Sequence, residues 1–217
     1  MSLIYNTGVY SLLIQVLTGV VDLYVLTLDF EGEIVFVKKL LWIEFLVQIV
    51  ELSFYVWLVS QFNTIANITQ YRYYDWIITT PSMLFTYSMF LLYHSEKHRE
   101  FYETVRENLL PFTAIALLNT SMLFFGFLAE IGRITFREGT ALGFVPFIMM
   151  FYIIYENYAK ATFLGKTTFW AFSGVWGLYG VASMMPYKYK NAWYNILDLF
   201  AKNFFGIFLA VYLWMNR

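Results

Sequence analysis

The chain has 217 residues, of which 60% are hydrophobic, 22% are aromatic and only 13% are charged, and its formal net charge is −1. A soluble domain carries about a quarter charged residues, so this composition indicates an outer surface that meets lipid. The near-neutral charge excludes the basic footprint of a nucleic-acid-binding protein. The absence of cysteine excludes disulfides, thiolate metal sites and thiol chemistry.

Seven apolar stretches, each close to the length of a membrane span, follow one another along the chain. They occupy residues 3–28, 34–60, 72–93, 108–129, 139–159, 163–183 and 191–215. Backbone groups in lipid need internal hydrogen bonds, and these stretches lack the apolar–polar alternation of barrel strands, so each is predicted to be a helix. The sequence therefore predicts an all-α, multi-pass integral membrane protein in which residues 1–217 form one seven-helix domain.

The distribution of basic residues favours one orientation of this bundle. The first stretch has no basic region before it and no small-residue cleavage site, so it is interpreted as a span and not as a signal peptide. With the N-terminus outside, the cytoplasmic side collects Lys38, Lys39, Lys97, Arg99, Arg106, Lys160, Lys166 and Arg217, against Arg133, Arg137, Lys188 and Lys190 outside. The positive-inside rule favours this arrangement, and an odd number of spans then places the C-terminus in the cytoplasm.

Ionisable side chains inside a bilayer are costly, so each of them is a candidate functional residue. Away from the predicted helix ends these are Asp22, Glu44, Glu51, Arg72, Asp75, Asp198 and Lys202. In the last span Asp198 and Lys202 lie four residues apart on one helix face, where they can pair. Such a pair fits either a charge-neutral structural ion pair or a buried amine that is used to form an imine.

Two local patterns distinguish between these interpretations. Residues 72–81 of the third span read RYYDWIITTP, which resembles the third-helix signature of microbial (type 1) rhodopsins. Residues 198–202 of the last span read DLFAK, which resembles the retinal-attachment motif in their seventh helix. The resemblance implies a seven-helix rhodopsin bundle with all-trans retinal on Lys202 as a protonated Schiff base, and with Asp75 and Asp198 as counterions. A cation among apolar walls needs opposite charge nearby, which supports this assignment physically.

The same resemblance implies a retinal pocket. Its residues by motif position are Trp76, Thr80, Met83, Met122, Gly126, Phe169, Phe172 and Trp176. Ordinary core packing would explain any one of them, because aromatic residues and methionine are abundant here. In the sixth span Phe169 and Phe172 stand where the pumps of this family usually have Trp and Tyr, and Ser173 stands where they have Pro. We therefore expect Asp198 to lose the tyrosine hydrogen bond that is usual in the pumps.

Two parts of an outward proton pump are missing from the sequence. The resemblance places the cytoplasmic proton donor eleven residues after Asp75, where this chain has Thr86, and a hydroxyl cannot act as a donor at neutral pH. No external release carboxylate precedes the seventh span, whose entry reads KYKN at residues 188–191. Retention of Asp75 disfavours chloride pumping, and the usual sodium-pump pattern is also absent.

Polar residues at helical spacing form a stripe on each of three spans. The stripes are Ser11, Gln15, Thr18 and Asp22; Glu44, Gln48, Glu51 and Tyr55; and Asn191, Asn195, Asp198 and Lys202. They could line a hydrated path whose acidic groups favour cations, or they could hydrogen-bond one another in a dry bundle. Glu44 and Glu51 resemble the helix-two glutamates of channelrhodopsins, and Thr86 with the short loops resembles the channel-forming group of viral rhodopsins.

The sequence thus predicts a light-gated channel for small monovalent cations, with an outward proton pump and a photosensory rhodopsin as alternatives. The predicted ion path and its gates consist of Ser11, Gln15, Glu44, Gln48, Glu51, Tyr55, Arg72 and Asn195. The expected partners are retinal, the lipid bilayer and small cations, and assembly into a homo-oligomer stays open. An enzyme is disfavoured, because no nucleophile or metal-ligand constellation accompanies the intramembrane carboxylates.

Overall fold

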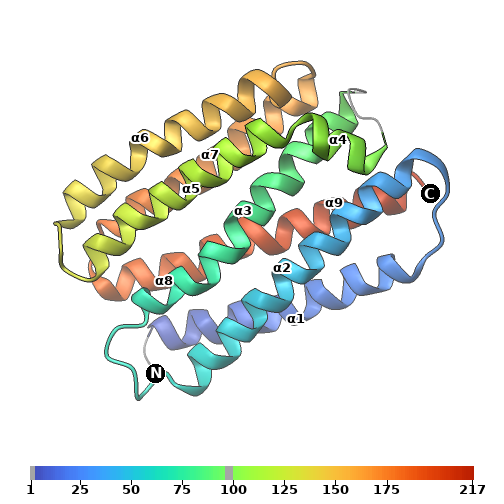
Figure 1. Cartoon of the computed structure of the whole chain (residues 1–217). Coiled ribbons are helices and arrows are strands. Elements are labelled where there is room, and N and C mark those ends of the chain that lie inside the picture. The colour runs from blue at the N-terminus through green and yellow to red at the C-terminus, as the bar shows by residue number, and fades with distance from the viewer. Residues whose placement is uncertain (1–2, 96–99) are drawn as a thin grey trace.

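The computed structural model describes residues 3–95 and 100–217, and their secondary structure is helical (Figure 1). The helices are α1 (Leu3–Thr27), α2 (Val35–Ser60), α3 (Thr69–His94), α4 (Phe101–Glu107), α5 (Leu109–Glu130), α6 (Phe136–Ile154), α7 (Phe163–Ser183), α8 (Tyr187–Asp198) and α9 (Phe204–Met215). A 3₁₀ turn at Gly32–Ile34 precedes α2. Turns of π-helix at Tyr155–Ala159 and Leu199–Asn203 extend α6 and join α8 to α9. Lys97 and Arg99, which the sequence predicts to be cytoplasmic, lie outside the described residues.

The long helices form a rhodopsin-like bundle, which confirms the predicted all-α fold. Because α8, its π turn and α9 continue one another, they count as one rod. Successive rods pack side by side, and this last rod also contacts α1, α2 and α7, which closes the bundle (Figure 1). The predicted limits of the spans agree with the helices to within about one turn. The N- and C-termini lie at opposite ends of the bundle, and these ends are named here after them.

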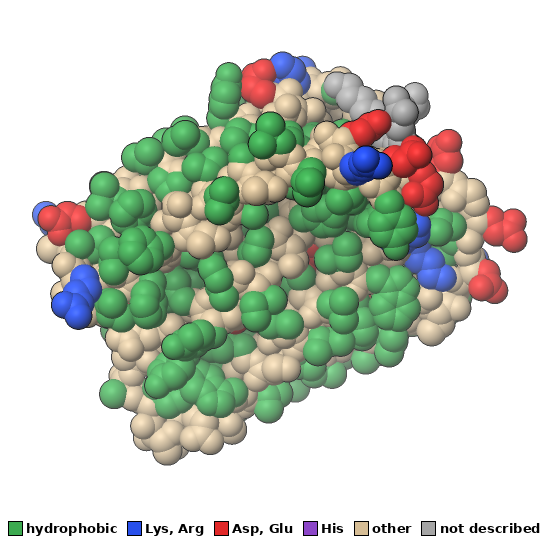
Figure 2. Space-filling view, viewed as in Figure 1, with side chains coloured by type: hydrophobic (Ala, Val, Ile, Leu, Met, Phe, Trp, Pro, Cys, Tyr) green, Lys and Arg blue, Asp and Glu red, His purple; other side chains and the backbone are tan. Residues whose placement is uncertain are grey.

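Among the described residues, five rods are long and apolar enough to cross a membrane by length and composition. They span Leu3–Thr27, Gly32–Ser60, Leu109–Glu130, Phe136–Ala159 and Tyr187–Met215. The helices α3 and α7 are of similar length but less apolar, and α3 carries Arg72 and Asp75 inside the bundle. Hydrophobic side chains cover much of the face in Figure 2, while charged side chains gather towards its two ends. The chain is therefore a multi-pass membrane protein.

Local signals in the sequence explain where the helices begin. Thr135 and Glu138 form a capping box at the start of α6, in which Thr135 N donates to Glu138 Oε2 at 2.8 Å and Glu138 N donates to Thr135 Oγ1 at 3.2 Å. Thr162 caps α7 by accepting from Gly165 N at 3.0 Å. Gly132, in the connection before α6, has a φ of 73°, a left-handed conformation that favours glycine.

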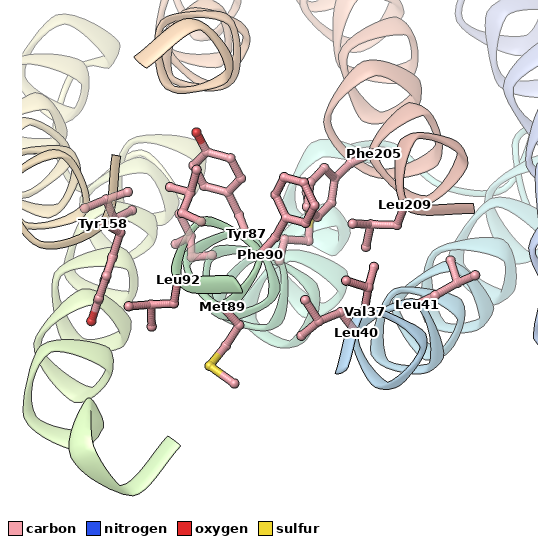
Figure 3. Close-up of a cluster of buried hydrophobic side chains, with 14 of the residues drawn as sticks. Val37, Leu40, Leu41, Tyr87, Met89, Phe90, Leu92, Tyr158, Phe205 and Leu209 are labelled. Carbon is pink, nitrogen blue, oxygen red and sulfur yellow. The ribbon is translucent and has the colours of Figure 1, made fainter. Parts of the chain in front are cut away.

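The interior of the bundle differs between its two halves. Towards the C-terminal end, α2, α3 and α9 meet in a cluster of buried apolar side chains, shown in Figure 3. We call the part of this cluster between those three helices the apolar plug; it consists of Val37, Leu40, Leu41, Phe90, Phe205 and Leu209. Towards the N-terminal end, α3 and α8 bury polar side chains instead, among them Arg72, Asn191 and Asn195. The predicted ionisable residues lie between these two regions or in the polar half, whereas the predicted pocket residues Phe169 and Phe172 belong to the apolar half.

Candidate functional site

Lys202 lies about halfway along the last rod, in the π turn, and its side chain is buried. Its Nζ is 2.5 Å from Asp75 Oδ2 on α3 and 3.9 Å from Glu51 Oε1 on α2. Turns of π-helix often occur at functional sites. Leaving a buried ammonium without a counter-charge is strongly unfavourable, so carboxylates from two other helices stabilise it here. The predicted pairing of Lys202 with Asp75 is present in this geometry.

Asp198 is held by a different set of partners. Its Oδ2 accepts from Tyr55 Oη at 2.7 Å and lies 3.3 Å from Arg72 Nη1, and its Oδ1 accepts from Tyr179 Oη at 2.7 Å. Among the described side chains, Asp198 therefore forms its ion pair with Arg72, whereas Lys202 pairs with Asp75 and Glu51. The four-residue spacing in the last rod permits an Asp198–Lys202 pair, but each of the two residues instead pairs with residues of other helices.

The expected loss of a tyrosine hydrogen bond at Asp198 is wrong. Tyr179 of α7 supplies it, seven residues after Phe172 and therefore about two turns further along the same face. Trp176 and Tyr179 both lie beside Lys202 in the wall of the central cavity, so they take the places that the sequence interpretation gave to Phe169 and Phe172. The sequence alone left this choice open, because Phe169 and Phe172 have the same three-residue spacing as Trp176 and Tyr179 and lie seven residues before them.

Arg72 connects the site to the N-terminal end of the bundle. Its guanidinium is fully buried and donates to Asn191 Oδ1 at 3.2 Å and, by a very short hydrogen bond, to Asn195 Oδ1. Asn195 Nδ2 in turn donates to Thr7 Oγ1 at 2.8 Å, and Ser11 Oγ donates to Asn195 O at 3.2 Å. A chain of hydrogen bonds thus links α1, α3 and α8, and Tyr55 adds α2 to it.

A second polar group lies between Lys202 and the apolar plug. Gln48 of α2 hydrogen-bonds to Asp22 of α1, and Thr86 of α3 donates to Glu44 of α2. Gly206 of α9 faces the first of these pairs, because a Cβ there would overlap both Asp22 and Gln48. The spacing of the stripes on α1 and α2 therefore brings their polar residues together, as the sequence predicted, and Thr86 joins them from α3.

Several buried polar atoms on these stripes, and on Asn203 beside Lys202, have no hydrogen-bond partner among the described residues. They are Gln15 Oε1, Asp22 Oδ1, Glu44 Oε2, Gln48 Oε1, both carboxylate oxygens of Glu51, and both side-chain polar atoms of Asn203. Most buried polar groups in proteins are hydrogen-bonded, so such a concentration indicates a site for polar ligands or ions. The sequence interpretation did not include Asn203, although an amide directly after Lys202 in an apolar stretch is a visible signal.

A cavity of about 880 Å³, its mouth included, opens beside Lys202 between α3, α5, α6 and α7. Six of the eight predicted pocket residues line it: Trp76, Thr80, Met83, Met122, Gly126 and Trp176. Further lining residues that the sequence interpretation did not name are Tyr179, Gly143, Phe144, Phe147 and Gly180. The size and the mainly apolar wall are typical of a small-molecule site.

The other two predicted pocket residues do not line this cavity. Phe169 packs against Phe151, with ring centroids 5.9 Å apart, and Phe172 stacks on Tyr87 at 4.3 Å. Both lie nearer the C-terminal end of the bundle, because α7 begins there. The cavity instead has an amine, Lys202 Nζ, at one point of its wall and mainly apolar surface elsewhere. Such a cavity suits an elongated apolar molecule with a carbonyl at one end, because a primary amine and an aldehyde form an imine.

Comparisons with known proteins agree with this geometry. The sequence matches the family described as bacteriorhodopsin-like protein over residues 6–216. The crystal structure of viral rhodopsin OLPVRII is 27% identical in sequence, with 100% of each chain covered and a TM-score of 0.85. A blue light-absorbing proteorhodopsin from Med12 is 18% identical, with 98% of this chain and 97% of that chain covered and a TM-score of 0.77.

Halorhodopsin, described as a light-driven chloride pump, is 14% identical, with 99% of this chain and 96% of that chain covered and a TM-score of 0.72. A search of curated proteins found no match. The family match extends over nearly the whole sequence, and the cavity, its lysine and the buried carboxylates lie within the matched residues. This chain is therefore a member of the bacteriorhodopsin-like protein family.

Proposed function

We propose that this protein is a light-gated channel for small monovalent cations, with all-trans retinal attached to Lys202. The family to which the chain belongs binds retinal in a membrane, and its structural neighbours include light-driven ion transporters. The cavity beside Lys202 fits such a group, because its wall is mainly apolar and a buried amine is within reach of one end. When bound there, retinal supplies light absorption and a light-induced change of shape.

The residues around Lys202 have separate tasks in this proposal. Asp75 and Glu51 stabilise a positive charge on the Lys202 nitrogen, and Asp75 dominates because its carboxylate is nearer, at 2.5 Å against 3.9 Å. Arg72 and two tyrosines hold Asp198 in place. Trp76 and Trp176 contribute apolar surface to the wall of the cavity.

One observation carries the choice of a channel. Glu44 and Glu51 are completely buried on one face of α2. Among the described residues Glu44 forms no ion pair, and Glu51 Oε1 lies 3.9 Å from Lys202 Nζ, which is beyond hydrogen-bond distance. In a dry bundle each buried oxygen would be expected to have a partner, yet both oxygens of Glu51 and one of Glu44 have none in the described part of the chain. Carboxylates placed along an intramembrane polar path favour cations.

The path follows the polar residues from one half of the bundle towards the other. It begins at Asn195 and Arg72, continues past Tyr55 and Glu51, and reaches Gln48 and Glu44. Beyond Glu44 the apolar plug closes it in this structure (Figure 3). Because a constriction of apolar side chains excludes water, opening requires α2, α3 and α9 to move apart at the plug.

The same proposal places the N-terminus outside and the C-terminus in the cytoplasm. Basic residues at the C-terminal end of the bundle are Lys38, Lys39, Arg106, Lys160, Lys166 and Arg217. Fewer basic residues lie at the opposite end, where they are Arg133, Arg137, Lys188 and Lys190, and Lys190 is buried in an ion pair with Glu130 at 2.6 Å. The positive-inside rule therefore supports this orientation.

An outward proton pump is the second candidate function, and the contact between Thr86 and Glu44 favours it. Thr86 occupies the place of the missing proton donor on α3, but the hydrogen bond brings a carboxyl group from α2 to that place. If Glu44 acts as the donor, the protein moves protons in one direction only. The two candidates therefore differ in whether the current can reverse.

The deciding experiment is a voltage-clamp recording of photocurrents with opposing sodium gradients across the membrane. A channel gives a current that reverses with the gradient, and Glu44→Gln or Glu51→Gln changes its size, selectivity or closing rate while the pigment still forms. Glu103→Gln is the matched control, because Glu103 is exposed on the short helix α4, outside the bundle interior. A current that keeps one sign under every gradient excludes the channel and leaves the pump.

A further inference from the structure

The cavity beside Lys202 contains a polar wall at its far side. Thr140 lies about one turn from the start of α6 and Ser183 is the last residue of α7, so both are near the N-terminal end of the bundle. Both line the cavity, and their hydroxyl oxygens are 2.8 Å apart. Lys202 lies on the opposite side of the cavity, halfway along the last rod. The proposed attachment of retinal does not use these two hydroxyls.

Counting protons shows what this wall offers to a ligand. By distance either hydroxyl could be the donor of this contact, but the shorter contact of the Ser183 hydroxyl with Gly180 O, at 2.6 Å, assigns the Ser183 proton to that carbonyl and leaves Thr140 as the donor to Ser183. A hydroxyl has one proton and two lone pairs. Both protons are therefore used, and Thr140 Oγ1 retains its capacity to accept. The pair can receive a hydrogen bond from a ligand but cannot donate one without breaking a bond already formed.

Tyr73 adds a donor to the same region of the cavity. Its side chain lines the cavity, and its hydroxyl has no hydrogen-bond partner within residues 3–95 and 100–217. A Cβ at position 126 would come within 2.6 Å of Tyr73 Oη, so Gly126 makes room for this hydroxyl. The far wall thus combines an acceptor on α6 with a phenol that can donate.

Glu130 and Trp176, two other residues with polar groups in the cavity wall, do not supply this combination of an acceptor and a donor. Glu130 also lines it, but its Oε1 accepts from Lys190 Nζ at 2.6 Å, and Lys190 lies 4.2 Å from the centre of the Phe136 ring. That lysine therefore already has its charge partner. Trp176 presents an indole N–H, but it lies seven residues, or about two turns, before Ser183 and so at another level of the bundle.

We propose that the cavity prefers a retinoid whose ring carries a hydroxyl group, with Thr140 accepting from that hydroxyl and Tyr73 donating to it. The inference rests on the proposed attachment at Lys202, because a ligand joined there through its aldehyde carbon extends its ring towards the opposite wall. An unsubstituted ring leaves both groups without a ligand partner. A ring hydroxyl satisfies both, and each net hydrogen bond favours binding by about 1 kcal/mol, or about five-fold.

The experiment is a competition for uptake, which needs no transport activity. The full-length protein, produced without chromophore in membranes, is given an equimolar mixture of all-trans retinal and all-trans-4-hydroxyretinal. Unbound retinoid is washed away, and the bound fraction is released and quantified by chromatography. Because the two hydrogen bonds act together, wild type should be enriched about 25-fold in the hydroxylated compound. A parallel mixture with 3-hydroxyretinal shows which ring carbon faces the wall.

Variants separate the polar wall from general packing. Thr140→Val keeps the shape of the side chain but removes its hydroxyl, and it should lower the enrichment about five-fold, whereas Thr140→Ser should retain it. Thr120→Val is the matched control, because Thr120 is exposed on α5 and bonds only within its own helix. If Thr140→Val forms no pigment at all, Tyr73→Phe provides an independent variant that should lower the enrichment.

Two outcomes overturn the inference. One is equal uptake of both retinoids by wild type, and the other is an enrichment that is undiminished in both Thr140→Val and Tyr73→Phe. Neither outcome affects the proposed attachment of retinal to Lys202. That proposal fails instead if wild type forms no coloured product with any of the retinoids, so the two failures are distinguishable.

Discussion

The Thr86 hydroxyl on α3 donates a hydrogen bond to the Glu44 carboxylate on α2, and both side chains are completely buried. This contact lies between Lys202 and the apolar plug, where a cation path would have to open and where a proton pump would need its donor. Both candidate functions therefore depend on the same pair of residues, and they predict different effects of changing it.

The pair can be tested by a double-mutant cycle. In a channel, Glu44→Gln and Thr86→Val should each change the closing rate of the photocurrent, and the double variant should resemble the single ones because the two residues act through one contact. In a pump, Glu44→Gln alone should slow the recovery of the photocycle several-fold, and an added weak acid should partly restore it. Additive effects of the two substitutions on the closing rate would show that the contact does not couple them.

Attachment of the chromophore is tested at Lys202. Lys202→Ala should give no visible absorbance when retinal is added, because the amine that faces the cavity is removed. Lys188→Ala is the control, since Lys188 is exposed in the first turn of α8 and should leave the spectrum unchanged. A normal pigment in Lys202→Ala would disprove covalent attachment at this residue.

The two carboxylates near Lys202 should affect colour unequally. Asp75→Asn removes the charge 2.5 Å from Nζ, while Glu51→Gln removes one at 3.9 Å. Coulomb energy falls with distance, so absorption should shift to longer wavelength in both variants and further in Asp75→Asn. Spectra of the purified pigments measure this directly. An equal or larger shift in Glu51→Gln would mean that Glu51 is the principal counterion.

The hydrogen bond between Asp22 and Gln48 should require glycine at position 206. In Gly206→Ala the new Cβ would overlap both Asp22 and Gln48, so their hydrogen bond must break or α9 must move away from α1 and α2. Overpacking of this kind typically costs about 1–3 kcal/mol, which should lower the midpoint of thermal bleaching.

Gly174→Ala provides the control for this prediction. Gly174 lies within α7, and a Cβ there would meet nothing within 4 Å, so alanine should be neutral or stabilising by up to about 1 kcal/mol. If both alanine variants bleach at the temperature of wild type, the close approach at Gly206 does not contribute to the stability of the protein.

The sequence by itself determined the class of structure and the residues at the centre of the candidate site. Long apolar stretches with internal backbone hydrogen bonds allow only helices in lipid, so the spans could be located to within about a turn. Lys202 and Asp75 could be identified because ionisable groups are rare inside the bundle and because each lies in a distinctive local motif. Helical spacing also placed Glu44, Gln48 and Glu51 on one face of α2, which depends on sequence alone.

Only the tertiary structure decided which of these groups meet. The motif on α7 was compatible with two positions one heptad apart, and the packing of α7 against α8 selects Tyr179 for Asp198. The contact of Thr86 with Glu44 joins α3 to α2 across 42 residues of sequence, and the wall of Thr140 and Ser183 joins α6 to α7 across 43. Spacing along one helix cannot predict such contacts, because they depend on the relative depth and rotation of two helices, which only the packing of the whole bundle determines.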